Sequence, residues 1–106
     1  MGTDCKVVIE KKCKGYTRVM WETIGVMHVP RNYEFFEDLR CSGFVGYPED
    51  IDWLSKDILE ATEDWGEGHI YYTDFLKLLK KHDMKDLDVI KKKLRDDCRV
   101  IYRFDN

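Results

Sequence analysis

Apolar and polar residues alternate with the period of a β-strand near the start of the chain. The apolar row is Cys5, Val7 and Ile9, and the row between them is Lys6, Val8 and Glu10. This pattern predicts a strand over residues 4–10 with one covered face. Residues 16–22 are again rich in β-branched and aromatic side chains and predict the second strand of a hairpin. Residues 24–29 either extend that strand beyond Gly25 or form a third one.

The middle of the chain has helical spacing. Asn32 is placed to cap a helix over residues 33–40, because its side-chain oxygen can accept from the free amides of the first turn. The apolar face of this helix is Phe35, Phe36 and Leu39. Residues 42–48 hold two glycines and a proline and predict a loop.

The second half of the chain predicts further helices and two strands. Asp50 or Asp52 can cap a helix that turns Trp53 or Leu54, Ile58 and Ala61 inward. Residues 69–72 predict a short strand, and Thr73 is placed to cap the helix that follows it. Residues 85–96 predict one more helix, and the alternation in residues 98–104 predicts a last strand that returns to the sheet.

This order of elements predicts an α+β fold. We expect a small antiparallel sheet, made of the N-terminal hairpin and the C-terminal strand, packed with three to four short helices. At 106 residues and 43% hydrophobic residues, we expect one globular domain over residues 1–106.

Composition and sequence patterns argue against several classes of protein. The net charge of −3 comes from mixed charges, so we expect no nucleic-acid partner. The sequence lacks an apolar run of membrane-spanning length and a signal-peptide pattern, so we expect no membrane association and a cytoplasmic location. The four cysteines lack the paired spacing of a zinc site, and we expect reduced thiols and no cofactor.

Histidines and aromatic residues are the candidates for a functional site. His82 lies beside lysines at a predicted helix end and is expected on the surface, whereas His69 follows a glycine-rich turn that can expose its imidazole. The sequence contains no phosphate-binding, dinucleotide-binding or zinc-protease motif. The aromatic residues exceed what a small core requires, and some of them are expected to stack on a planar ligand or a partner; the set is Tyr16, Trp21, Tyr33, Tyr47, Trp53, Trp65, Tyr71 and Tyr72.

Five short motifs occur in a characteristic order. They are Met1-Gly2-Thr3-Asp4-Cys5-Lys6, Arg31-Asn32-Tyr33, Gly46-Tyr47-Pro48-Glu49-Asp50, His69 with Thr73, and Phe104-Asp105-Asn106. Together they resemble an uncharacterised family of small bacteriophage and bacterial proteins that begin Met-Gly-Cys-Asp-Ile-His and end Phe-Asp-Asn. Thr3 and Lys6 replace the family's cysteine and histidine, which weakens a metal or nucleophile role for the first motif.

The resemblance implies no particular activity for this chain, because the family is uncharacterised. It does imply a set of polar residues that converge in space. As a ligand-binding site this set is Asp4, Arg31, Asn32, Tyr33, Asp50, His69 and Asp105. A structural alternative is that Arg31, Asn32 and Asp50 form a buried network that holds the loop.

We therefore expect a cytoplasmic phage accessory protein that binds a host protein or a small nucleotide-like ligand without turning it over, with counter-defence as one possible role. The alternative is a small metal-dependent hydrolase that uses His69 with Asp4, Asp50 or Asp105. A homodimer formed through exposed tryptophan and tyrosine side chains is a third possibility.

Overall fold

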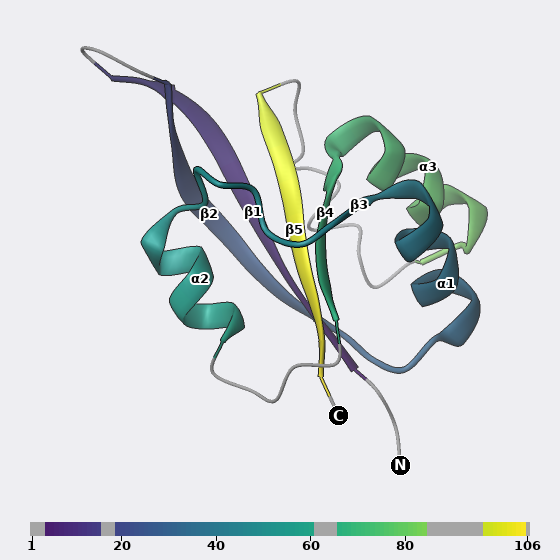
Figure 1. Ribbon diagram of the computed structural model, residues 1–106. Helices are drawn as coiled ribbons and strands as arrows, with labels where there is room; N and C mark the ends of the chain where they lie inside the picture. Colours follow the sequence, from purple (N-terminus) through teal and green to yellow (C-terminus); the bar gives the residue numbers. More distant parts are fainter. Residues whose placement is uncertain (1–3, 16–18, 61–65, 85–96, 106) are drawn as a thin grey trace.

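The chain folds as an antiparallel sheet with helices on both faces (Figure 1). A computed structural model describes residues 4–15, 19–60, 66–84 and 97–105. Within them the strands are β1 (Asp4–Lys14), β2 (Val19–Val29), β3 (Phe44–Val45), β4 (Glu67–Tyr71) and β5 (Cys98–Asp105). The helices are α1 (Tyr33–Ser42), α2 (Trp53–Leu59) and α3 (Tyr72–Lys81). The predicted α+β class is confirmed, and the strand order in the described sheet is β2-β1-β5-β4-β3.

Two apolar clusters lie on opposite faces of the sheet. Helices α1 and α3 pack Phe35, Leu39 and Phe75 against the odd-numbered residues of β1, and α2 packs Leu59 against Val8 and Ile101 on the other face. The expectation that only one face of the first strand is covered is therefore wrong. Because α2 covers the second face, both Val8 and Glu10 are fully buried.

The two ends of the described chain meet at one end of the sheet. β1 and β5 are antiparallel neighbours, with Asp4 opposite Asp105 and Glu10 opposite Arg99. β2 is a single strand, and the break expected at Gly25 is instead a shift in its register with β1 between Ile9 and Glu10. The pairing of β1 with β5 therefore places residues from the two ends of the described chain side by side in the sheet.

Two predicted cap residues, Asn32 and Asp52, occupy the cap positions of their helices, but only Asn32 makes a capping bond with its side chain. The Asn32 side chain accepts a hydrogen bond from the Phe35 amide at 3.1 Å, as predicted. Thr73 does not cap α3, because β4 runs directly into the helix and Tyr71 takes the cap position. Asp52 precedes α2, but its carboxylate makes no capping bond because Thr23 of β2 engages it.

The inward face of α2 agrees with the prediction at Ile58, which is partly buried against the cluster of Val8, Leu59 and Ile101, but it differs at other positions. Ser55 and Leu59, one turn apart, are its buried residues, and Trp53 is 75% exposed. Asp52, directly before the helix, is bound to Thr23 of β2, which ties the start of α2 to that strand. Ala61 and the helix predicted over residues 85–96 lie outside the described residues.

His82 is mostly buried rather than on the surface as expected. Its side chain is 10% exposed, its Nε2 lies 2.7 Å from Asp38 Oδ2, and its ring packs edge-on against Phe35. Because Asp38 is on α1 and His82 follows α3, this contact joins the two helices. The role of His82 is therefore structural.

Gly68 of β4 lies close to the Tyr102 hydroxyl of β5. A Cβ at this position would collide with that hydroxyl and would lie 2.6 Å from the Phe44 carbonyl oxygen. We expect Gly68→Ala to lower the free energy of unfolding by about 1–3 kcal/mol, because β4 must move away from β5. Urea unfolding checks this. Ser42→Ala, a change at an exposed position, is the control, and an unaltered midpoint for Gly68→Ala would contradict the packing.

Candidate functional site

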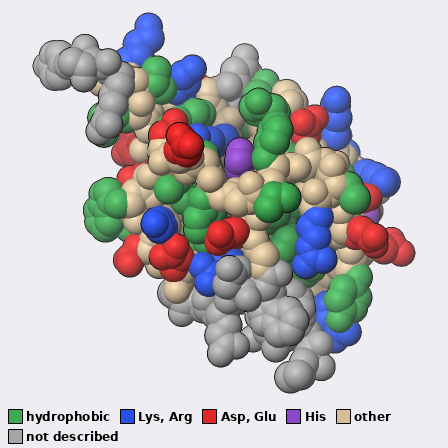
Figure 2. Space-filling model, in the orientation of Figure 1, with side chains coloured by type: hydrophobic (Ala, Val, Ile, Leu, Met, Phe, Trp, Pro, Cys, Tyr) green, Lys and Arg blue, Asp and Glu red, His purple; other side chains and the backbone are tan. Residues whose placement is uncertain are grey.

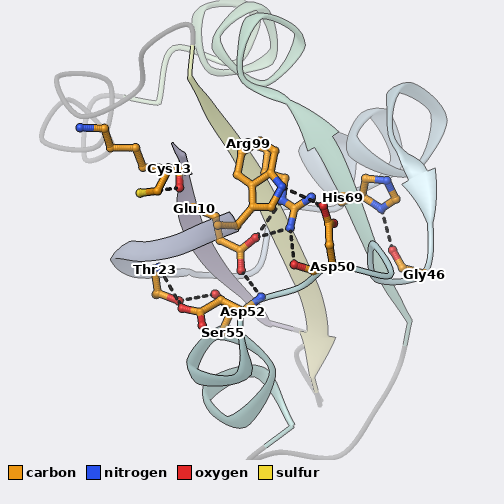
Figure 3. Close-up of polar contacts among 11 residues, drawn as sticks. Glu10, Cys13, Thr23, Gly46, Asp50, Asp52, Ser55, His69 and Arg99 are labelled. Carbon is orange, nitrogen blue, oxygen red and sulfur yellow. Dashed lines mark hydrogen bonds and ion pairs between the residues drawn. The ribbon is translucent and has the colours of Figure 1, made fainter. Parts of the chain in front are cut away.

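A buried ion pair lies on the face of the sheet that α2 partly covers. Arg99 Nε donates to Glu10 Oε1 at 2.8 Å, and its Nη2 lies 2.7 Å from the same oxygen. The other oxygen of Glu10 accepts from the Asp52 backbone amide at 2.9 Å. The buried carboxylate thus has partners on both oxygens, and it ties β1 to β5 and to the loop before α2 (Figure 3).

Asp50 binds the outer side of the same arginine. Arg99 Nη1 donates to Asp50 Oδ1 at 2.8 Å, and the Trp21 indole donates to Asp50 Oδ2 at 2.9 Å. The guanidinium lies 3.8 Å from the centre of the Trp21 ring, within the range of a cation–π contact. The guanidinium is therefore enclosed by two carboxylates and an indole.

Asp52 links the loop to the edge strand. Its carboxylate accepts from the Thr23 amide at 3.0 Å and from the Thr23 hydroxyl at 2.7 Å, and that hydroxyl also lies 2.5 Å from Ser55 Oγ. Together with the ion pair between Asp50 and Arg99, these hydrogen bonds hold the loop against the sheet. This is the loop-holding role considered from the sequence, but Arg99 supplies it in place of Arg31.

The Asp50 contacts change its acidity. Partial burial raises the pKa of the Asp50 carboxyl, but the hydrogen bonds and charge of Arg99 and the bond from Trp21 lower it more, so that the net pKa lies below the ordinary value. The carboxylate therefore stabilises the fold above its unfolded pKa of about 3.9, and this contribution is lost as the pH falls through the lower folded pKa.

We expect Asp50→Asn to be less stable than the parent at pH 7 by up to about 1 kcal/mol, since the side chain is half exposed. The difference should shrink below pH 3.9 and vanish once both states are protonated. Urea unfolding at a series of pH values measures it. Asp57→Asn, at an exposed position of α2, is the matched control, and a difference that persists at the lowest pH would contradict the assignment.

His69 lies to the right of this network in Figure 3, beside Gly46. Its Nδ1 donates to the Gly46 carbonyl oxygen at 2.8 Å, because a carbonyl can only accept. Its ring stacks on Phe44 with centroids 5.1 Å apart, and Phe44 meets Tyr71 edge-on at 5.5 Å. In the neutral imidazole this leaves Nε2 as a hydrogen-bond acceptor.

A pocket of about 540 Å³ lies between this ring cluster and the Arg99 network. Cross-strand register places Tyr71 opposite Arg99 and His69 opposite Ile101, so these side chains share one face. The lining includes Lys12, Trp21, Phe44, Pro48, His69, Tyr71, Thr73, Asp97 and Arg99. Figure 2 shows hydrophobic side chains mixed with charged ones on the side of the molecule that carries α2. The pocket combines aromatic walls with a few polar groups.

The structure does not gather the residues that the sequence proposed as one site. His69 lines the pocket, and Asp50 holds Arg99 beside it. Arg31 lies 4.6 Å from the centre of the Tyr33 ring at the start of α1, where Asn32 is the cap. Asp4 lies beside His28 at 3.4 Å, and Asp105 pairs with Asp4 at the end of the sheet. No group of three His, Cys, Asp or Glu side chains that could hold a metal occurs in the part of the chain that is described.

Few of the residues that line the pocket and its network could be recognised from the sequence. Trp21, Tyr71 and Tyr72 belong to the aromatic set, whereas Phe44 lay in a predicted loop. Nothing in the sequence marks Glu10 or Arg99 as part of a site, because each occupies an ordinary polar position of an alternating strand.

No family model, curated protein or solved structure matches this chain. Among the described residues, no helix has the length and apolar character needed to cross a membrane.

Proposed function

We propose that this chain is a non-catalytic binding module that holds a small nucleotide-like ligand in the pocket between Trp21 and Tyr71. The observation that carries the proposal is the cluster of rings around one pocket. Phe44 and Tyr71 remain 48% and 61% exposed although they touch each other. Exposed aromatic faces on a sheet suit the stacking of a planar base.

The size and charge of the pocket support the same ligand class. Its volume falls within the range of about 300–1,000 Å³ that small-molecule sites occupy. Lys12 is exposed on the pocket lining, and among the described residues its ammonium group has no carboxylate partner. In a bound nucleotide, the base would stack on the aromatic rings and the phosphate would lie beside the Lys12 ammonium group.

Holding a ligand without turning it over agrees with how the polar groups are engaged. Arg99 is bound by Glu10 and Asp50, and His69 Nδ1 is bound by the Gly46 carbonyl. These contacts fix the walls of the pocket. The resemblance to small phage proteins supports the further proposal that the bound ligand is withheld from host enzymes, as a counter-defence protein would do.

Calorimetric titration with the four ribonucleoside monophosphates, with thermal unfolding of the same mixtures, tests the proposal. Ribose 5-phosphate and inorganic phosphate are the controls without a ring. We expect at least one nucleotide to bind and to raise the midpoint of unfolding, since a ligand at 100 times its Kd adds about 2.7 kcal/mol. No binding by any nucleotide, or equal binding by ribose 5-phosphate, would overturn the proposal.

A further inference from the structure

The outer edge of β2 has open backbone groups. β2 is the terminal strand of the described sheet, and the Thr23 amide donates to Asp52 rather than to β1. The register with β1 is regular from Val19 to Thr23. Because outward-facing residues alternate along an antiparallel strand, Trp21 and Val19 also direct their amide and carbonyl groups to this edge.

Apolar side chains surround this open edge. Val19 is 44% exposed, Met20 is 50% exposed, and Trp53 projects from the start of α2. Together with Trp21 and Ile51 they line a groove of about 360 Å³. Large exposed apolar side chains gathered in one place mark a contact surface.

The groove is acidic on the side of the loop. Glu49, Asp50 and Asp52 line it, and among the described residues no lysine or arginine does. The Asp50 carboxylate is paired with the Arg99 guanidinium, and the Asp52 carboxylate accepts a hydrogen bond from the Thr23 hydroxyl. Glu49 is exposed. The partner that complements this surface carries positive charge beside apolar side chains.

We propose that an extended, basic segment of another protein adds to β2 as a sixth strand along residues 19–22. Its backbone would pair with Val19 and Trp21, an apolar side chain would lie against Trp53, and a lysine or arginine would lie near Glu49. The added strand would end before Thr23, because the Thr23 amide already donates its hydrogen bond to the Asp52 carboxylate. A second copy of this chain fits less well, since pairing two β2 edges would bring two acidic loops together.

Blocked five-residue peptides test the proposal by nuclear magnetic resonance titration. The probe alternates lysine and valine; one control replaces lysine with glutamate, and a second is methylated on the backbone nitrogens. We expect the lysine peptide to shift the Val19 and Trp21 amide signals and to slow their hydrogen exchange, and we expect both controls to bind at least about tenfold more weakly.

Matched variants locate the contact. Glu49→Lys should raise the Kd for the lysine peptide about threefold and Trp53→Ala about tenfold, whereas Glu37→Lys, at an exposed position of α1, should leave it unchanged. Equal binding of the glutamate or methylated peptide, or no binding of the lysine peptide, would overturn the proposal. Protection of the Val19 and Trp21 amides in a dimer of the free protein would also overturn it.

Discussion

Glu10→Ala is expected to lower the free energy of unfolding by about 3–5 kcal/mol. Glu10 is fully buried, and its carboxylate holds both the Arg99 guanidinium and the Asp52 amide. Removing it leaves the largely buried arginine paired only with the half-exposed Asp50 carboxylate among the described residues, and it leaves the Asp52 amide without its acceptor. Removing one partner of a buried, hydrogen-bonded ion pair is among the most destabilising single changes. Since small domains are stable by about 5–15 kcal/mol, the variant should be close to unfolding at room temperature.

Urea unfolding followed by circular dichroism measures this effect. Glu49→Ala is the matched control, because Glu49 is exposed, and its change should stay within about 0.5 kcal/mol. Glu10→Gln should be intermediate, because the amide keeps one acceptor for Arg99 while the charge is lost. A loss below about 1 kcal/mol for Glu10→Ala would show that the ion pair does not hold the sheet and the loop together.

Tyr71→Ala and Phe44→Ala are each expected to weaken nucleotide binding by about 1–3 kcal/mol, the usual value of one ring stacked on a base. This corresponds to a rise in Kd of about 5- to 150-fold. Calorimetric titration of both variants with the nucleotide that binds the parent chain gives the comparison. Both side chains are about half exposed, so their removal should change affinity more than stability.

Tyr33→Ala is the control for these two variants. Tyr33 is 56% exposed, similar to Tyr71, but it lies at the start of α1 and does not line the pocket. Its removal should leave the Kd unchanged. If Tyr33→Ala weakened binding as much as Tyr71→Ala, the ligand would have to bind at another place on the molecule.

Arg99 belongs both to the ion-pair network with Glu10 and Asp50 and to the lining of the pocket. Its guanidinium is bound to Glu10 and Asp50 and stacked on Trp21, so it is a fixed wall rather than a free cation for the ligand. The pocket is therefore preorganised by contacts that also hold the fold. Preorganised walls reduce the entropy that binding costs.

Local patterns were sufficient for the features that depend on neighbouring residues. The Asn32 cap depends on an amide three residues ahead, and the alternation from Cys98 onward gave the last strand. The glycine-rich turn before His69 predicted an accessible imidazole, and His69 lines the pocket; a functional role for it stays a prediction.

Features that depend on distant parts of the chain were missed. Glu10 and Arg99 are 89 positions apart, and each is an ordinary polar residue of an alternating strand until the sheet places them opposite each other. Ser55 and Leu59 of α2 were not predicted to face inward, and Ser55 lies beside Thr23 of another element. Arg31 was proposed as the loop-holding arginine from the set of residues that the resemblance implies, whereas the sheet supplies Arg99 from a distant part of the chain.

The most direct test of the proposed function is where a bound nucleotide lies. Nuclear Overhauser effects between the base protons of the nucleotide and protein side chains report contacts within a few ångströms. We predict such contacts with Phe44 and Tyr71, on the walls of the pocket. Contacts confined to residues outside this pocket, such as Tyr33 and Phe36 of α1, would contradict it.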